Sequence, residues 1–311
     1  MAEPDGLNVN QTELISILID DPKKCHEFNV QSLEMLEILG LGGYGTVSAL
    51  NDTMVVKSSH REQVSVLESD CFMSRGCKSD ILLEGLILYI LNKVRCKHFV
   101  YMYGLYKCHD NYFLLMERIH GISYTQFIKL HPTDDIKKVI LFQITYALYI
   151  ANQYVDFVHG DLIGQNIMIE SVTPKNEEYV IEGQTYMVNN HGIRAVIIDF
   201  GFSRIRTRPP NEKIKLYQTH RLYVPDLFAD EDDKFNSTAD ICKIYCNPNF
   251  SLPEFNDVII MKRIGREYRL SDLLKQCRRT SHANVAIPPF PEITARDIIT
   301  STLFRDILGR I

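Results

Sequence analysis

The sequence predicts an α+β protein in which a strand-rich first part is followed by a helix-rich second part. Short β-prone runs separated by turn residues extend from residue 36 to residue 117. A long helical pattern with one apolar face covers residues 134–154, and the change of pattern falls near residues 118–122. Because 311 residues suffice for a substantial core, we expect two lobes with a cleft between them.

Composition and charge describe an ordinary globular chain. Hydrophobic residues make up 45% of the sequence, charged residues 23%, and the formal net charge is −5, which gives no reason to expect nucleic acid as a partner. The first residues lack the basic and apolar regions of a signal peptide, and the longest apolar run, residues 81–91, is too short to span a bilayer. We therefore expect no membrane insertion and an intracellular, cytoplasmic location.

The eight cysteines are scattered and include no Cys-x-x-Cys pair. Cys242 and Cys246 stand four residues apart and would make half a zinc site, but no matching His or Cys pair follows them. The sequence therefore predicts reduced thiols in the core of a protein from a reducing compartment.

The first part of the chain divides into a polar leader, residues 1–30, and an N-terminal lobe, residues 31–118. The leader contains one short amphipathic helical pattern, residues 12–20. In the lobe, turn residues separate the β-prone runs, and the helical pattern is strongest over residues 81–94. The expected strands are 36–39, 46–50, 53–57, 99–106 and 112–117, and the expected helix is 62–94.

A C-terminal lobe is expected over residues 119–311. Its main helix, residues 134–154, has Thr133 or Asp134 as its candidate N-cap. The other expected elements are short strands at 167–169 and 195–198, an extra hairpin in an insertion at 171–194, and mixed helix and loop with a proline-rich stretch at 287–291.

A glycine-rich run covers residues 40–47. It reads Gly-Leu-Gly-Gly-Tyr-Gly-Thr-Val and fits the pattern G-x-G-x-x-G-x-V. In a dinucleotide-binding unit such glycines open a helix, whereas here the following residues are β-prone. The run therefore predicts a glycine hairpin whose backbone can approach phosphates, with a plain β-hairpin that binds nothing as the alternative.

Lys57 ends the apolar run at residues 54–57, beside the glycine hairpin. There its ammonium group can bridge phosphate oxygens, although a surface lysine at a strand end is the ordinary alternative. Glu84 is the favoured partner for Lys57, because a charge inside an apolar helix needs one. Glu62 and Glu68 are the rival partners.

Three polar residues follow in apolar surroundings. Asp161 and Asn166 lie on a loop between the long helix and a strand, and Asp199 follows another strand in Ile-Ile-Asp-Phe-Gly. A carboxylate that orients a hydroxyl group, together with an Asn and an Asp that hold magnesium, is the set that phosphoryl transfer requires.

With these motifs in this order, the chain resembles the protein-kinase superfamily over residues 34–245. The resemblance implies a bilobal protein-kinase-like fold with a β-rich N-lobe and a mainly helical, shortened C-lobe. It also implies Mg²⁺ and ATP as cofactors, with Met116 as gatekeeper, residues 117–119 as the hinge against adenine, and Asp240 as the helix residue that braces the catalytic loop. The implied catalytic residues are Asp161, Lys57 and Glu84, the metal ligands are Asn166 and Asp199, and the nucleotide-binding residues are Gly40, Leu41, Gly42, Gly43, Gly45, Val47, Lys57, Met116, Glu117 and Ile119.

The sequence departs from the usual kinase pattern at several points. Gly160 replaces the arginine that reads activation-segment phosphorylation, Ile163 replaces a lysine near the γ-phosphate, and no Ala-Pro-Glu motif follows Asp199. Arg204, Arg206 and Arg208 would receive a phosphate, dock an acidic substrate or form a solvated loop. These features look most like the reduced serine/threonine kinases of large DNA viruses, or haspin-like and Bud-type kinases.

The expected function is transfer of the γ-phosphoryl group of Mg-ATP to serine or threonine hydroxyl groups of a protein substrate. A small-molecule phosphotransferase is one alternative, because His-Gly-Asp-Leu also occurs in such enzymes and the acidic run at residues 231–233 would line an acceptor pocket or a solvated loop. A pseudokinase scaffold is the other alternative. Against it, Lys57, Asp161, Asn166 and Asp199 are all present.

Overall fold

The computed structural model divides into two compact units. Unit 1 comprises residues 1–119, 153–159 and 199–223, and unit 2 comprises residues 120–152, 160–198 and 224–311. The structure describes residues 11–27, 36–41, 45–59, 80–108, 111–207, 214–216, 238–245, 247, 250–256, 258–263, 266–272 and 293–310.

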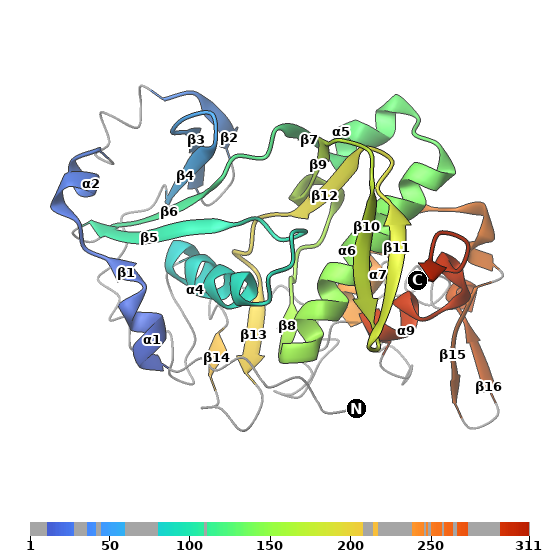
Figure 1. Cartoon of the computed structure of the whole chain (residues 1–311). Helices are drawn as coiled ribbons and strands as arrows, with labels where there is room; N and C mark the ends of the chain where they lie inside the picture. The colour runs from blue at the N-terminus through green and yellow to red at the C-terminus, as the bar shows by residue number, and fades with distance from the viewer. Residues whose placement is uncertain are drawn as a thin grey trace, which may run out of the picture. The chain divides into compact units, whose positions relative to one another are not determined.

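Unit 1 is built on a six-stranded sheet with the order β1-β5-β6-β4-β3-β2 (Figure 1). All neighbouring strands are antiparallel except β1 and β5, which are parallel. The strands are β1 (Leu18–Ile19), β2 (Ile38–Leu41), β3 (Gly45–Ala49), β4 (Met54–Ser59), β5 (Met102–Cys108) and β6 (Asn111–Glu117). The five expected strands of the N-terminal lobe are therefore present, with shifted ends.

Helix α4 (Asp80–Lys93) packs against strands β4, β5 and β6. Its sequence is apolar on nearly every side, which is typical of a helix that is buried all round. Gly85 permits close contact with the sheet, because a Cβ atom there would lie 2.8 Å from the Leu105 side chain. The earlier part of the expected helix, residues 62–79, lies outside the described residues.

The leader is more structured than the sequence predicts. Instead of a single helix over residues 12–20, the chain forms α1 (Gln11–Ser16), strand β1 and α2 (Pro22–Glu27). Strand β1 forms because it pairs with β5, a tertiary contact that a local pattern does not contain. Helix α2 begins at a favourable pair: Asp21 accepts a hydrogen bond from the Lys23 N–H at 2.9 Å, and Pro22 takes the first helical position.

Two contacts join the leader to α4. The Tyr89 hydroxyl group donates to Glu13 Oε1 at 2.7 Å, and the Lys93 ammonium group forms an ion pair with the same carboxylate. Burial and the Glu13 carboxylate together raise the pKa of Tyr89 to about 12. Helix α1 is therefore held against the last turns of α4.

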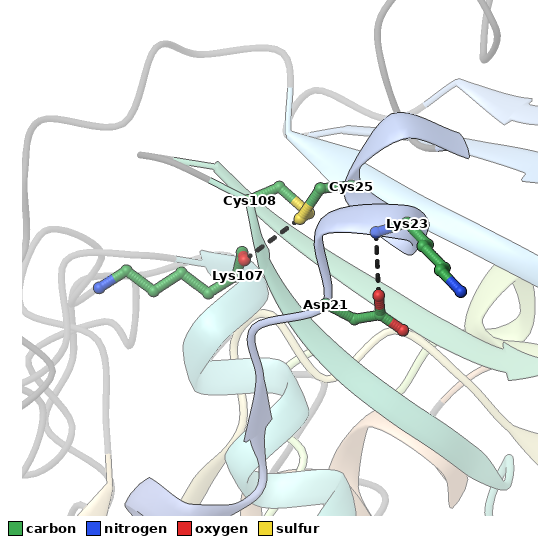
Figure 2. The surroundings of a disulfide bond; sticks show 5 residues. All are labelled: Asp21, Lys23, Cys25, Lys107 and Cys108. Carbon is green, nitrogen blue, oxygen red and sulfur yellow. Dashed lines mark hydrogen bonds between the residues drawn. A yellow bond between two sulfur atoms is a disulfide. The ribbon is translucent and has the colours of Figure 1, made fainter.

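A disulfide bond joins Cys25 of α2 to Cys108 of β5 across 83 residues, with the two Cα atoms 5.2 Å apart (Figure 2). The Lys107 carbonyl oxygen lies 3.5 Å from the Cys25 sulfur. The prediction of reduced core thiols is therefore wrong for this pair, because folding brings together two cysteines that have no characteristic spacing in the sequence. Among the described residues, Cys96 and Cys242 are not part of a disulfide bond; Cys246, the other half of the zinc alternative, lies outside them.

A second, three-stranded sheet of unit 1 has the order β14-β13-β8. Its strands are β8 (Val155–Val158), β13 (Arg204–Thr207) and β14 (Lys215–Leu216). Arg204 is buried, and the Arg206 guanidinium group lies 2.6 Å from Asp156 Oδ2. Arg204 and Arg206 are therefore part of strand β13, and the alternative that residues 204–208 form a solvated loop is wrong for these two residues. Arg208 lies outside the described residues.

Unit 2 contains the long helix α6 (Asp134–Tyr154), whose bounds agree with the expected helix. Thr133 caps its start, because the Thr133 hydroxyl oxygen accepts from the Ile136 N–H at 3.4 Å. The short helical segments of the unit are α5 (Tyr124–Phe127), η2 (Ile128–Leu130), η3 (Gly164–Asn166), α7 (Thr238–Tyr245), η6 (Pro253–Asn256), α9 (Ala295–Ile299) and η7 (Thr302–Phe304).

The described part of unit 2 contains more strand than the sequence predicts. Its sheets are β7-β9-β12, β10-β11-β17 and β15-β16. Where the extra hairpin is expected, β10 and β11 pair around a turn in which Glu182 and Gly183 have φ values of 52° and 76°, as a type I′ hairpin turn requires. The strands are β7 (Gly121–Ser123), β9 (Ile167–Ser171), β10 (Asn176–Ile181), β11 (Gln184–Asn189), β12 (Ile193–Ile197), β15 (Ile259–Arg263), β16 (Arg266–Arg269) and β17 (Gly309–Arg310).

Across the described ranges, no helix combines the length and the apolar character needed to cross a membrane. The acidic run at residues 231–233 and the proline-rich stretch at 287–291 lie outside those ranges.

Candidate active site

The glycine-rich run forms the hairpin of β2 and β3. Gly40 pairs with Val47 and Leu41 with Thr46, so the described ends of the run belong to two paired strands, and the element that begins at Gly45 is a strand. At Gly45 a side chain has no room, because a Cβ atom would lie 2.3 Å from the Ser58 carbonyl oxygen of β4. Gly42 and Gly43, which are also expected to contact nucleotide, lie outside the described residues.

Lys57 lies on β4, paired with Val47 on one side and Leu114 on the other. Its ammonium nitrogen lies 2.7 Å from Glu84 Oε2 and 2.8 Å from Asp199 Oδ1. Glu84, the partner expected from the sequence, is only 1% exposed. The rival partners Glu62 and Glu68 lie outside the described part of the chain.

The three charges alter one another's pKa values. Burial alone would lower the pKa of Lys57, but the Glu84 and Asp199 carboxylates outweigh burial and raise it. Burial raises the pKa of Glu84, and the Lys57 ammonium group opposes this. For Asp199 burial is again the largest influence and would raise the pKa, but Lys57 and the neighbouring donors outweigh it and the pKa falls. Lys57 is therefore protonated, and Asp199 ionised, at neutral pH.

Asp199 begins the segment Asp-Phe-Gly that follows β12. It has a φ value of 63°, a left-handed conformation that is uncommon for a residue with a side chain. Phe200 is fully buried, and its N–H donates to Glu84 Oε1 at 3.2 Å. Its ring packs near the rings of Phe99 and His159. Glu84 therefore holds both the lysine and the segment that positions Asp199.

The expected gatekeeper and hinge residues end strand β6. Met116 is buried and pairs with Val55 of β4. The backbone N–H of Glu117 donates to the Tyr101 carbonyl oxygen at 2.9 Å, and the Glu117 side chain accepts from the Tyr101 N–H at 2.9 Å. Ile119, two residues later, is half-buried. These contacts fix the end of β6.

In unit 2, a loop between β8 and β9 contains Asp161 and Asn166. The Asn166 amide nitrogen donates to the Asp161 carbonyl oxygen at 2.8 Å and to Asp161 Oδ2 at 3.1 Å. Asp240 of α7 is fully buried and accepts from the Gly160 N–H at 3.0 Å, as the resemblance implies. Gly160 has a φ value of 79°, so an arginine would be strained at this position.

One residue that contacts this loop is missed by the sequence analysis. The ammonium group of Lys243, on α7, lies 3.5 Å from Asp161 Oδ1 and donates to the Gly160 carbonyl oxygen. The sequence feature that could have identified Lys243 is its position three residues after Asp240, because residues three apart lie on the same side of a helix.

The family model "Protein kinase domain" matches residues 33–246. The chain belongs to the protein kinase family. Its α+β architecture is accordingly the kinase fold. Among the described residues, no group of three or more His, Cys, Asp or Glu side chains is arranged to hold a metal ion.

Several known proteins are similar to this kinase. An uncharacterized Caenorhabditis elegans protein is 25% identical over 212 residues, which cover 64% of this chain and 68% of that protein. The serine/threonine-protein kinase haspin of Mus musculus is 24% identical over 216 residues, 57% of this chain and 28% of haspin. Haspin of Bos taurus is 30% identical over 97 residues, 31% of this chain and 12% of haspin. The matches thus span less than a third of either haspin.

Among solved structures, Rad53 residues 1–466 in complex with AMP-PNP matches with a TM-score of 0.35 and 21% identity, over 53% of this chain and 36% of that one. The sequence matches agree with the haspin-like placement expected from the motifs. The resemblance to kinases of large DNA viruses stays a prediction.

Proposed function

We propose that this kinase transfers the γ-phosphoryl group of Mg-ATP to serine or threonine hydroxyl groups of protein substrates. The observation that carries the proposal is the position of the buried Lys57 side chain between Glu84 and Asp199. In protein kinases a strand lysine paired with a helix glutamate contacts the nucleotide phosphates, and the aspartate of Asp-Phe-Gly holds Mg²⁺. The similarity to haspin, a serine/threonine-protein kinase by name, supports the choice of acceptor.

In this proposal Lys57 contacts the α- and β-phosphates, and the hairpin residues Gly40 to Val47 cover them with backbone groups. Met116, Glu117 and Ile119 contact adenine. Glu84 keeps the ammonium group of Lys57 in place, because the strand alone does not fix the end of a long, flexible side chain.

Asn166 and Asp199 have the donor chemistry that Mg²⁺ prefers, namely amide and carboxylate oxygens. Both hydrogen bonds from the Asn166 side chain to Asp161 use its amide nitrogen, which leaves the amide oxygen for a cation. Asp199 is ionised and its side chain is 45% exposed. When bound, Mg²⁺ would neutralise charge on the β- and γ-phosphate oxygens.

Asp161 acts as the base for the acceptor hydroxyl group. The hydroxyl oxygen forms a bond to the γ-phosphorus, the bond from that phosphorus to the bridging oxygen breaks, and ADP leaves with the electron pair. The hydroxyl proton passes to Asp161. The Asn166 bond at 3.1 Å keeps the Asp161 carboxylate in a defined orientation.

The test incubates the purified chain with labelled ATP and Mg²⁺, with casein or myelin basic protein as acceptor and, separately, with a panel of small hydroxyl and amino compounds. We expect labelled phosphoserine or phosphothreonine. Asp161→Asn should lower the transfer rate on the order of 10²-fold or more while nucleotide binding persists, because only the base is lost. Asp134→Asn, in an exposed ion pair on α6, is the matched control.

Labelling of small compounds alone would replace the proposal with a small-molecule phosphotransferase. Absence of transfer to every acceptor would indicate a pseudokinase. An Asp161→Asn variant that retains most of the activity would remove Asp161 from its assigned role.

A further inference from the structure

Helix α7 holds the backbone of the catalytic loop at two points. The buried Asp240 carboxylate accepts from the Gly160 N–H at 3.0 Å, and the Lys243 ammonium group donates to the carbonyl oxygen of the same residue. Residues three apart on a helix lie on the same side. Asp240 and Lys243 therefore bind the N–H and the carbonyl oxygen of Gly160, the residue that precedes Asp161.

Lys243 also brings a positive charge to Asp161. Its ammonium nitrogen lies 3.5 Å from Asp161 Oδ1, and the two side chains are 38% and 35% exposed, so both remain within reach of a ligand. By contrast, residues 158–169, which include the whole loop, contain no lysine or arginine. Ile163, two residues after Asp161, is half-buried and apolar.

During phosphoryl transfer, negative charge is concentrated near the Asp161 carboxylate. The base, the γ-phosphoryl group and the leaving phosphate are all anionic, and catalysis depends largely on placed positive charge. A half-exposed lysine ammonium group suits this task, because it is a compact charge on a flexible stem. Residues 158–169 contain no lysine or arginine for this task.

We propose that Lys243 is a positioning residue for phosphoryl transfer: from α7 it orients the Asp161 carboxylate and supplies the positive charge that the catalytic loop lacks. This inference rests on the proposed function. It differs from the role of Asp240, which is fully buried and accepts from the Gly160 backbone N–H.

The test measures steady-state kinetics of Lys243→Met, Lys243→Arg and the double variant Lys243→Met/Ile163→Lys, with ATP and a labelled protein acceptor. Lys243→Met should lower kcat on the order of 10²-fold, as loss of one charge-stabilising group does. The KM for ATP should change less than about threefold, because in this proposal Lys243 does not bind the adenine base or the α- and β-phosphates. Lys243→Arg should keep most of the activity. A lysine at position 163 should recover at least about a tenth of the lost rate.

Lys137→Met, at an exposed ion pair with Asp134, is the control and should leave kcat unchanged. Thermal unfolding of each variant shows whether the substitution has destabilised the fold. Recovery of activity by a lysine at position 163 would show that the lost charge is responsible, because that lysine does not repair a packing defect at position 243. A kcat of Lys243→Met within twofold of wild type would overturn the inference. It would also be overturned if Lys243→Arg lost as much activity as Lys243→Met and the relocated lysine gave no recovery. A wild-type chain without any transfer would overturn the proposed function first, and this inference with it.

Discussion

The Lys57 ammonium nitrogen lies 2.7 Å from Glu84 Oε2, and Glu84 belongs to a helix that is apolar on nearly every side. Removing one member of a buried ion pair leaves an uncompensated charge in the core. Stability and nucleotide binding are therefore expected to depend on the same contact.

Lys57→Met should lower the free energy of unfolding by about 3–5 kcal/mol, and it should weaken ATP binding. The measurement is urea unfolding with and without nucleotide. Lys137→Met, whose ion pair with Asp134 at 2.9 Å is exposed, should cost less than about 0.5 kcal/mol. Equal losses in the two variants would show that the Lys57 pair is not buried as described.

The Lys57 charge should also govern the titration of Asp199. Its pKa in the folded chain lies below the ordinary value of 3.8, so the ionised carboxylate contributes stability above that pH, and this contribution is lost as the pH falls through the lowered pKa. Carbon-13 NMR of the aspartate carboxyl groups should show Asp199 titrating below 3.8, and Lys57→Met should raise its pKa. An Asp199 pKa that is the same in both proteins would contradict the contact.

Activity should not require phosphorylation of the segment after Asp199. Gly160 has no guanidinium group for a phosphate to neutralise, and Arg206 is already paired with Asp156 at 2.6 Å. The protein is expressed together with a phosphatase, and its intact mass is measured to confirm that it carries no phosphate. Its initial rate of phosphoryl transfer should equal that of the phosphorylated form. A lag that autophosphorylation abolishes, or a rate about tenfold below that of the phosphorylated form (~1.4 kcal/mol), would refute this expectation.

The disulfide should stabilise the chain when it is purified without reductant. Peptide mapping should find Cys25 linked to Cys108, and Cys25→Ser should lower the free energy of unfolding by about 2–4 kcal/mol. Cys242→Ser, at a half-buried cysteine outside the disulfide, is the control and should change stability by less than about 0.5 kcal/mol. If reductant leaves the wild-type unfolding curve unchanged, the bond does not form in solution.

Much of the candidate site follows from the sequence because its signals are local. The glycine run, the apolar run that ends at Lys57 and the loop around Asp161 are each recognisable from a short stretch of sequence. Even the partner Glu84 is predictable, since an acidic residue in an apolar helix must have a compensating group.

The missing parts depend on contacts between distant segments. Cys25 and Cys108 are 83 residues apart, and Lys243 is far from Asp161 in the sequence and looks like an ordinary surface lysine of a short helix. Strand β1 is two residues long and exists because β5 accepts it. No local pattern encodes these partners.

That short strand has a consequence for solubility. A strand on the outside of a sheet presents unpaired N–H and C=O groups, which form a template for association with other chains. Leu18 and Ile19 occupy this side of β5 by pairing with Leu105 and Tyr106. The outer strand of this side of the sheet is thus only two residues long, which limits pairing with another chain. A chain shortened past residue 19 is expected to self-associate through β5.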